Sequence, residues 1–159
     1  MSRSTFSSEL DSFDLAILRI LQNDSTTPQR EVGEQVNLSA PSVQRRIKRM
    51  QRDGVIAVQA AIVDPARVGL PLTIIVEIEL KAETGGKIDE IKETFLEAPE
   101  IQQCYYVTGE VDFVLIVIVS DMAEYEDLTQ RLFFSNHNIR KFKTFVTMDR
   151  TKTNTSLNI

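Results

Sequence analysis

A short basic stretch carries the side chains of this sequence that are best suited to binding chemistry. Between Val36 and Arg52 there are five cations and no acidic residue. Guanidinium and ammonium groups neutralise phosphates, hydroxyl and amide groups hydrogen-bond to base edges, and a small apolar side chain can contact a thymine methyl group. These groups together predict binding to double-stranded DNA. The cations are Arg45, Arg46, Lys48, Arg49 and Arg52, and the other candidates are Ser39, Pro41, Ser42 and Gln44.

A helix has to position these groups. Ser39 is a suitable N-cap, and Pro41 fits the first helical turn, where a missing N–H has no consequence. Apolar residues then recur at i, i+4 and i+7, which predicts one buried stripe; they are Val43, Ile47 and Met50. At about 100° per residue, Arg46 flanks this stripe, while Arg49 lies near the cations that point away from it. An isolated run of this kind is more often a solvated helix face, so the flanking elements decide.

The residues before the basic stretch predict a helix-turn-helix. Asp11 can cap a helix that ends at about Asn23, and Thr27-Pro28 can be the N-cap and first position of a second, short helix. Asn37 lies in the tight turn before the basic helix, where a residue that tolerates left-handed geometry is needed. Two helices joined by such a turn, over about residues 29–48, form the pattern by which many proteins enter the DNA major groove.

A change of periodicity predicts a second domain. Residues 64–71 contain two prolines and a glycine and are the best linker candidate. The β-rich run 55–63 before them is consistent with a wing that completes a first domain, residues 1–63. Residues 72–159 then read strand, helix, strand, strand, helix, strand, which is the ferredoxin-like βαββαβ order. We therefore predict an α+β protein with an N-terminal winged helix-turn-helix domain and a C-terminal ferredoxin-like domain.

One strand of the second domain lacks a polar face. Residues 113–119 are apolar on both sides, and Ile75 lies opposite the main apolar stripe of its own strand. Helices can cover one face of a sheet, and the sheet of a second protomer is the simplest cover for the other. Burial of both faces within one domain is the alternative.

Composition limits the class of protein. The 159 residues carry a net charge of −5; residues 1–64, with eight basic and eight acidic groups, are neutral, so the acidic excess lies in the second domain. No apolar run approaches the ~18 residues that span a bilayer, and the N-terminus lacks an apolar signal core. Cys104 and His137 are each the single residue of their type, which excludes an internal disulfide and a thiolate–imidazole metal cluster. We predict a cytoplasmic protein with no membrane partner and no metal or organic cofactor.

Several motifs, in this order and spacing, resemble the Lrp/AsnC (leucine-responsive, feast–famine) family of transcriptional regulators over about residues 10–157. They are Leu10-Asp11-x-x-Asp14-x-x-Ile17-Leu18, Leu38-Ser39 followed by Arg46, Gly54-Val55-Ile56, Gly109-Glu110-x-Asp112 and Asp121-Met122-x-x-Tyr125. The resemblance implies a sequence-specific regulator with a DNA-binding domain and a RAM/ACT-like domain that dimerises and binds an amino acid. It also implies a homodimer that assembles to an octamer on operator DNA, and hence a nucleoid-associated protein.

The resemblance directs attention to the loop Gly109–Asp112 as an effector site. N–H groups in a tight, glycine-bearing turn can hold the α-carboxylate of an amino acid, and Asp112 can hold its ammonium group. The alternative is that Gly109 only makes a turn and Asp112 only caps backbone groups. The predicted set is Gly109, Glu110, Val111, Asp112, Met122, His137 and Thr147, of which the last three are carried over from the family's pocket location.

Two other classes of function stay open. Sirohaem decarboxylase subunits resemble the same two-domain architecture, although such an enzyme needs histidines near its substrate and this chain has only His137. A ligand-sensing scaffold, whose helix-turn-helix contacts protein instead of DNA, is the other alternative. The sequence has no nucleophile–His–Asp constellation, no Walker or dinucleotide fingerprint and no His-Glu-x-x-His motif. We therefore predict no catalytic residue.

Overall fold

The chain forms two compact units in a computed structural model that describes residues 9–81 and 85–159. The first unit combines the residues up to Ile62 with Thr153–Ile159, and the second consists of Val63–Lys152. The chain therefore passes from one unit to the other twice, whereas the sequence predicts a single linker. The domain boundaries given above stay predictions.

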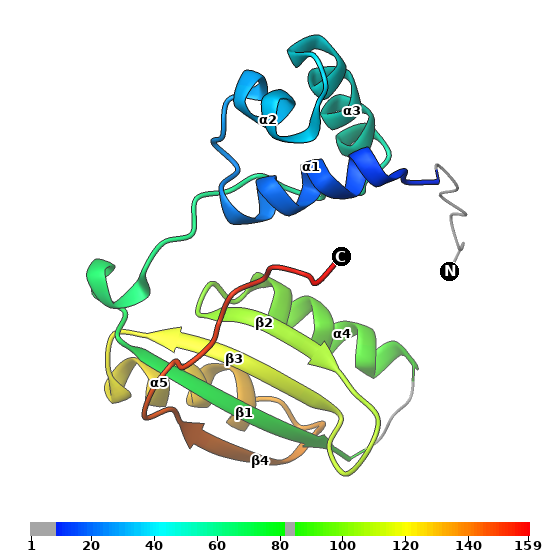
Figure 1. The fold of residues 1–159 in the computed structure, drawn as a ribbon. Coiled ribbons are helices and arrows are strands. Elements are labelled where there is room, and N and C mark those ends of the chain that lie inside the picture. Colours follow the sequence, from blue (N-terminus) through cyan, green and yellow to red (C-terminus); the bar gives the residue numbers. More distant parts are fainter. Residues whose placement is uncertain (1–8, 82–84) are drawn as a thin grey trace. The chain divides into compact units, whose positions relative to one another are not determined.

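The described residues of the first unit form three helices: α1 (Ser12–Asn23), α2 (Gln29–Val36) and α3 (Ala40–Arg52) (Figure 1). α1 begins at a capping box, in which the Asp11 carboxylate accepts from the Asp14 N–H at 2.9 Å and the Asp14 carboxylate accepts from the Asp11 N–H at 3.1 Å. Ser39 is the N-cap of α3, as predicted. The three helices bury a common apolar cluster, formed by Ile17, Leu18, Val32, Val36, Val43, Ile47 and Met50.

The start of α2 differs from the prediction, and its end confirms it. Pro28, not Thr27, occupies the N-cap position, and the helix N-terminus has no side-chain cap. The Thr27 hydroxyl instead donates to the Asp24 carbonyl oxygen at 2.9 Å. At the other end Asn37 adopts the left-handed conformation, with φ 57° and ψ 43°. This residue reverses the chain so that α3 can follow after two further residues.

The predicted wing is wrong for this chain. Residues 55–64 contain neither helix nor strand, and Val58 and Ile62 are 76% and 88% exposed. A strand needs a neighbour for its N–H and C=O groups, and the described residues of the first unit contain no other strand. The segment is therefore not part of a sheet. It leads into a short 3-10 helix, η1 (Pro65–Val68), which Asp64 caps.

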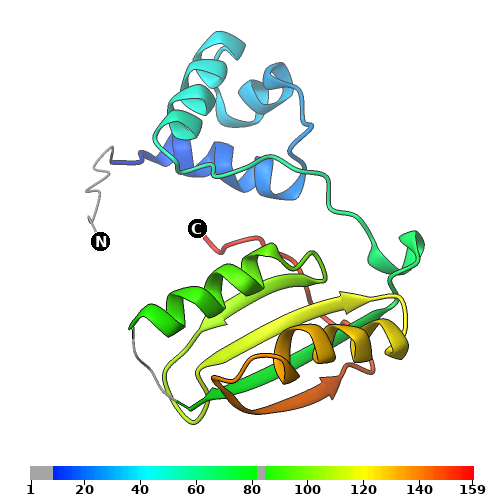
Figure 2. The same ribbon diagram turned by 180° about the vertical axis from the view of Figure 1, so that it is seen from behind.

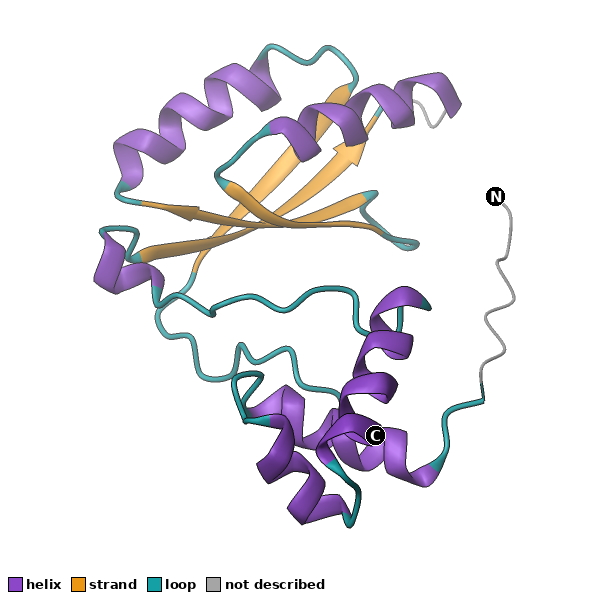
Figure 3. Ribbon diagram, turned by 90° about the horizontal axis from the view of Figure 1, so that it is seen from above, coloured by secondary structure: helices purple, strands orange, loops and turns teal. Residues whose placement is uncertain are grey.

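The second unit is a four-stranded antiparallel sheet with helices on one face. Its strands are arranged in the order β2-β3-β1-β4, which confirms the ferredoxin-like order predicted from the sequence. In chain order the elements are β1 (Leu72–Leu80), α4 (Gly85–Glu97), β2 (Ile101–Tyr106), β3 (Phe113–Val119), α5 (Met122–Leu128), the π-helix η2 (Thr129–Phe134) and β4 (Ile139–Val146). Figure 2 and Figure 3 show α4 and α5 on the same side of the sheet.

The core of the second unit lies between the sheet and these helices. Alternate residues of β1 and β3, such as Val76 and Leu115, are completely buried on this side. Phe95 of α4 packs edge-on against Phe113 and Phe133, with ring centroids 5.5 and 6.3 Å apart. The opposite face of the sheet is the one on which the sequence places Ile75.

Candidate nucleic-acid interface and effector site

The outward face of α3 is an exposed, cationic surface. Gln44, Arg45 and Lys48 are exposed, and with Pro41 and Arg52 they line an open hollow of about 530 Å³, to which Arg49 also contributes. Arg45 and Lys48 take part in no ion pair with the described residues. Their charges are therefore free for an anionic partner. The buried stripe of α3 faces the other way, as its spacing predicts.

Polar groups at the two ends of α3 are partly engaged within the protein. The Ser39 hydroxyl accepts from the Ser42 N–H at 3.4 Å and donates to the Ser42 hydroxyl at 3.0 Å, so this pair forms the helix N-terminus. At the C-terminal end the Arg52 Nε donates to Asp53 at 2.9 Å, which raises the Arg52 pKa further. The Arg52 side chain is 74% exposed, so solvent weakens this ion pair and the charge remains available.

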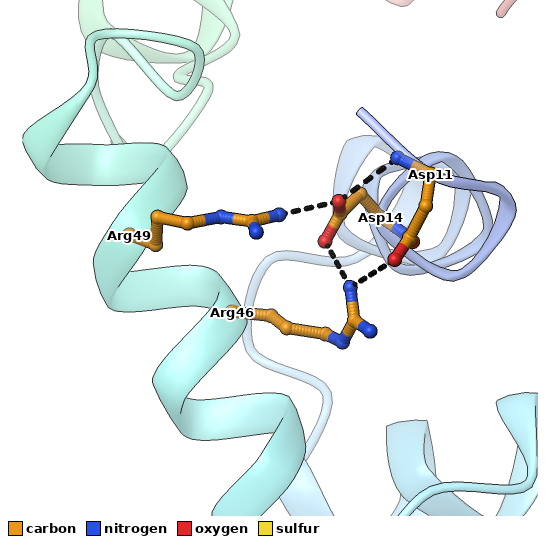
Figure 4. Close-up of polar contacts among 4 residues, drawn as sticks. All are labelled: Asp11, Asp14, Arg46 and Arg49. Carbon is orange, nitrogen blue, oxygen red and sulfur yellow. Dashed lines mark hydrogen bonds and ion pairs between the residues drawn. The ribbon is translucent and has the colours of Figure 1, made fainter. Parts of the chain in front are cut away.

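The structure directs Arg46 and Arg49 inward, to α1 (Figure 4). Arg46 Nη1 donates to Asp11 Oδ2 at 2.7 Å and to Asp14 Oδ1 at 2.8 Å. Arg49 Nη2 makes a short hydrogen bond to Asp14 Oδ2. The Asp14 side chain is completely buried, whereas the Arg46 and Arg49 side chains are 21% and 33% exposed. We call these four residues, Asp11, Asp14, Arg46 and Arg49, the α1–α3 clamp.

The clamp is reinforced on the Arg46 side. The Arg46 guanidinium lies 5.5 Å from the centre of the Phe13 ring, within the range of a cation–π contact. Hydrogen bonds from the Asp14 N–H and then from Arg46 hold the pKa of Asp11 below its ordinary value. Hydrogen bonds to Asp11 and Asp14 raise the Arg46 pKa. Asp11 and Arg46 are therefore both charged at neutral pH.

Of the nine residues predicted to bind DNA, the structure thus brings seven to the exposed side or the start of α3 and turns two toward α1. Sequence reasoning placed Arg46 at the edge of the apolar stripe, which is correct, but it missed the carboxylates that face it. The sequence predicts Asp11 only as a helix cap, and Asp14 only as part of a family motif. The available signal was an acidic pair at i, i+3 beside an otherwise apolar helix face.

The Gly109–Asp112 loop is tied to the end of β1. Asp112 Oδ2 accepts from the Leu80 N–H at 2.6 Å, and the Asp112 N–H donates to the Ile78 carbonyl oxygen at 2.8 Å. Gly109 has φ 136°, a conformation that a side chain would strain. These contacts give Gly109 and Asp112 the structural roles that the sequence analysis left open as the alternative. A ligand role for the second carboxylate oxygen of Asp112 stays a prediction.

One chain does not bring the predicted effector residues together. The Gly109–Asp112 loop and His137 lie where β1 ends and β4 begins, since Ile78 pairs with Phe113 and Leu80 with Ile139. Met122 follows β3 at the opposite end of the sheet, and there the Thr147 N–H donates to the Thr73 carbonyl oxygen at 3.0 Å. A hollow of about 240 Å³ at the first end is lined by His137 but by no other member of the set; its other residues are Lys87, Glu90, Ile91, Asn136 and Asn138.

The outward face of the sheet combines an apolar patch with paired charges. Ile75 lies between Ile116 of β3 and Phe145 of β4 in the cross-strand register, and Phe145 is 48% exposed. Farther along, Glu77 pairs with Lys143 at 3.5 Å, and Glu79 pairs with Arg140 at 2.9 Å. We call this surface, from Ile75 to Glu79 and its cross-strand partners, the outer sheet face.

Other kinds of site find no basis in the described part of the chain. No cluster of three His, Cys, Asp or Glu side chains there is placed to hold a metal ion. No helix of residues 9–81 and 85–159 is both long and apolar enough to cross a bilayer. Burial raises the pKa of the single thiol, Cys104, so this group is predominantly protonated at neutral pH.

Comparison with known proteins assigns both units. The family model for the AsnC-type helix-turn-helix domain matches residues 10–51, and that for the Lrp/AsnC ligand binding domain matches residues 73–157. An uncharacterized HTH-type transcriptional regulator of Sinorhizobium fredii is 42% identical over 147 residues, which cover 92% of this chain and 87% of the relative.

Two solved structures share the fold over nearly the whole chain. The crystal structure of an AsnC family transcriptional regulator from Agrobacterium tumefaciens has a TM-score of 0.88 at 34% identity and covers 93% of this chain and 96% of its own. A transcriptional regulator from Neisseria meningitidis, solved in complex with L-Met, has a TM-score of 0.87 at 26% identity with the same two coverages. None of these relatives supports the enzyme alternative.

Proposed function

The chain belongs to the Lrp/AsnC family of DNA-binding transcriptional regulators, and we propose that it binds duplex DNA through the outward face of α3. The observation that carries this proposal is the exposure of Arg45, Lys48 and Gln44 on one side of a helix whose other side is buried. Arg45, Lys48 and Arg52 would neutralise phosphates, while Gln44 and Pro41 face base edges in the major groove. A regulator of this family is not an enzyme, and the proposal assigns no catalytic residue.

A single helix of this length reads few base pairs, so useful specificity requires two copies on two half-sites. The outer sheet face supports a homodimer. Ile75, Ile116 and Phe145 would lie against the same patch of a second copy, because a twofold interface is self-complementary. The charged pairs at Glu77 and Glu79 would lie nearer its rim. Assembly of such dimers to an octamer is the further step that the family resemblance implies.

We also propose that the second unit binds an amino acid. The family model of this unit is a ligand binding domain, and the Neisseria meningitidis relative was solved with L-Met. Because one chain separates the Gly109–Asp112 loop from Met122 and Thr147, a site that includes both needs residues from two chains. Such a site would link occupancy to assembly, and assembly to DNA affinity. Location at the nucleoid would follow from DNA binding.

The salt dependence of DNA binding tests the proposed interface. We expect the logarithm of the association constant to fall linearly with the logarithm of salt concentration for a mixed-sequence duplex. Arg45→Gln and Lys48→Gln should each reduce that slope by about 0.9 per subunit, since each removes one phosphate contact. Arg67→Gln, which removes an 87% exposed cation of η1 outside both proposed surfaces, is the matched control and should leave the slope unchanged. Equal slopes for all four proteins would exclude α3 as the DNA-binding surface.

A further inference from the structure

We propose that Asp14 is a positioning residue for DNA binding, which holds α3 on α1 through Arg46 and Arg49 and withholds both arginines from the DNA phosphates. The inference rests on the proposed role of α3 and adds to it. It divides the five cations of the basic stretch into three that contact DNA, Arg45, Lys48 and Arg52, and two that orient the helix carrying them.

The first step is the environment of Asp14. Its side chain is completely buried and accepts three hydrogen bonds, from Arg46 Nη1, from Arg49 Nη2 and from the Asp11 N–H. A buried carboxylate is tolerated only when it is paired and hydrogen-bonded. Both arginines help to compensate this buried charge, and either one that turned to a phosphate would leave an oxygen of the buried Asp14 carboxylate without its guanidinium partner.

The second step is the direction of the arginine side chains. Arg49 Nε is buried and has no hydrogen-bond partner among the described residues, which shows that this guanidinium is drawn inward up to its inner nitrogen. Arg46 is held from two directions, by the carboxylates of Asp11 and Asp14 and by the Phe13 ring. Arg45 and Lys48, in contrast, are exposed. Figure 4 shows both clamp arginines extending from α3 to α1.

The third step is the effect of two arginine contacts to one carboxylate on the orientation of α3. Arg46 and Arg49 lie three residues apart on α3 and meet the two oxygens of the same carboxylate. The hydrophobic effect that buries the apolar stripe is itself non-directional, and two charge-assisted hydrogen bonds to one buried acceptor add a directional restriction on the rotation of α3 about its axis. That rotation decides which side chains face the DNA. Asp14 thus acts on base recognition through the orientation of α3, without touching the nucleic acid.

The test measures salt slopes and sequence preference with the full-length chain. Arg49→Gln is compared with Arg45→Gln, which makes the same change on the outward face of the same helix. We expect Arg45→Gln to lower the slope on a mixed-sequence duplex and Arg49→Gln to leave it unchanged. Asp14→Asn removes the charge that holds both arginines, so we expect a slope that is steeper by up to about 1.8 per subunit, because two further cations become available to phosphates.

Sequence preference provides the second measurement. The unmodified protein first selects a preferred site from a random duplex library. The preference is the ratio of the affinity for this site to the affinity for random duplex. We expect this ratio to be at least tenfold smaller for Asp14→Asn than for the unmodified protein. A purely structural role would lower the melting temperature but would neither steepen the slope nor reduce this preference in the folded fraction, which circular dichroism reports. If Asp14→Asn does not fold, the comparison of Arg49→Gln with Arg45→Gln decides alone.

The outcomes separate the two proposals. If Arg49→Gln lowers the slope as much as Arg45→Gln does, Arg49 contacts phosphate and the clamp proposal is overturned while the α3 interface stands. If a folded Asp14→Asn variant keeps both slope and preference, the positioning role is likewise overturned. If neither Arg45→Gln nor Lys48→Gln changes the slope, the α3 interface itself is wrong.

Discussion

Gly33 of α2 and Leu38 of the turn approach each other so closely that no side chain fits between them. The Leu38 N–H donates to the Gly33 carbonyl oxygen at 2.9 Å, and a Cβ built on Gly33 would lie 2.4 Å from the Leu38 carbonyl oxygen. The contact allows the chain to reverse at Asn37 and to start α3. Gly33 is thus required by the geometry of the turn, although a glycine inside a helix is otherwise unfavourable.

We expect Gly33→Ala to destabilise the first unit by about 1–3 kcal/mol, because backbone atoms have to move to admit a methyl group. This exceeds the gain of about 1 kcal/mol in helix propensity that alanine brings. Urea unfolding followed by circular dichroism measures the difference. Gly86→Ala is the control, since a Cβ at that helical position meets nothing within 4 Å, and it should be neutral or stabilising. Equal stability of Gly33→Ala and the unmodified chain would contradict the argument.

Substitutions at Asp112 separate its structural role from a ligand role. Asp112→Ala removes the acceptor of the Leu80 N–H and should cost about 1–3 kcal/mol of unfolding free energy. Asp112→Asn keeps an acceptor of the same shape and should cost much less. If Asp112 also holds the ammonium group of an amino acid, Asp112→Asn should abolish the ligand-induced rise in melting temperature while keeping the fold.

A thermal-shift screen of the twenty amino acids, run on the unmodified chain and on Asp112→Asn, measures the ligand-induced rise in melting temperature. A ligand that binds only the folded state raises the melting temperature by mass action. A stabilising amino acid that acts equally on Asp112→Asn and the unmodified chain would show that the carboxylate has only the structural role.

Acid should destabilise both units through carboxylates whose pKa values are lowered in the folded state. The Asp11 pKa lies below its ordinary value of 3.8, mainly because of the Asp14 N–H and then Arg46, and the Glu124 pKa lies below 4.5 because of the Ser120 N–H and hydroxyl. A carboxyl with a lowered folded pKa contributes stability above its unfolded pKa and loses it as pH falls.

We therefore expect the melting temperature to be nearly constant, as far as these groups are concerned, down to about pH 5 and to decrease below that. Asp11→Asn and Glu124→Gln should each make the melting temperature depend less steeply on pH below pH 5. The melting temperature at neutral pH then reports the hydrogen bonds that each substitution removes. Melting curves between pH 3 and pH 7 check both. If the melting temperature of both variants decreases as steeply with falling pH as that of the unmodified chain, other groups cause the acid sensitivity.

The outer sheet face predicts a mutant that separates folding from assembly. Ile75→Glu places a charge between Ile116 and Phe145, and we expect it to convert the dimer to a folded monomer, as measured by light scattering after size exclusion. Leu96→Glu is the control, because Leu96 is 80% exposed on α4, on the helical side of the same unit. A dimer that persists in Ile75→Glu would place the interface elsewhere.

Local patterns predicted most of the fold. The caps at Asp11 and Ser39 and the left-handed turn at Asn37 are decided by residues within one helical turn, so the sequence reveals them directly. The strand order of the second unit follows from its alternation of strands and helices. The wing prediction failed because β propensity alone cannot supply the neighbouring strand that residues 55–63 would need.

The ion pairs between α3 and α1 could not be predicted from such local patterns. The basic stretch and its amphipathic face were evident from spacing, yet the separation of Arg46 and Arg49 from the other cations was not. Their partners lie 32 and 35 residues earlier in the chain, and spacing within one helix carries no information about what faces it. The same limit applies to the predicted effector set, whose members lie at two ends of the sheet within one chain.

The sequence by itself determined that a basic helix follows a tight turn, that an alternating α/β segment follows it, and that each element has at least one apolar face. Those properties depend on neighbours a few residues away. Only the tertiary structure decided which cations stay free and which are bound by a buried aspartate, because that choice depends on how α1 and α3 meet when their apolar stripes are packed together.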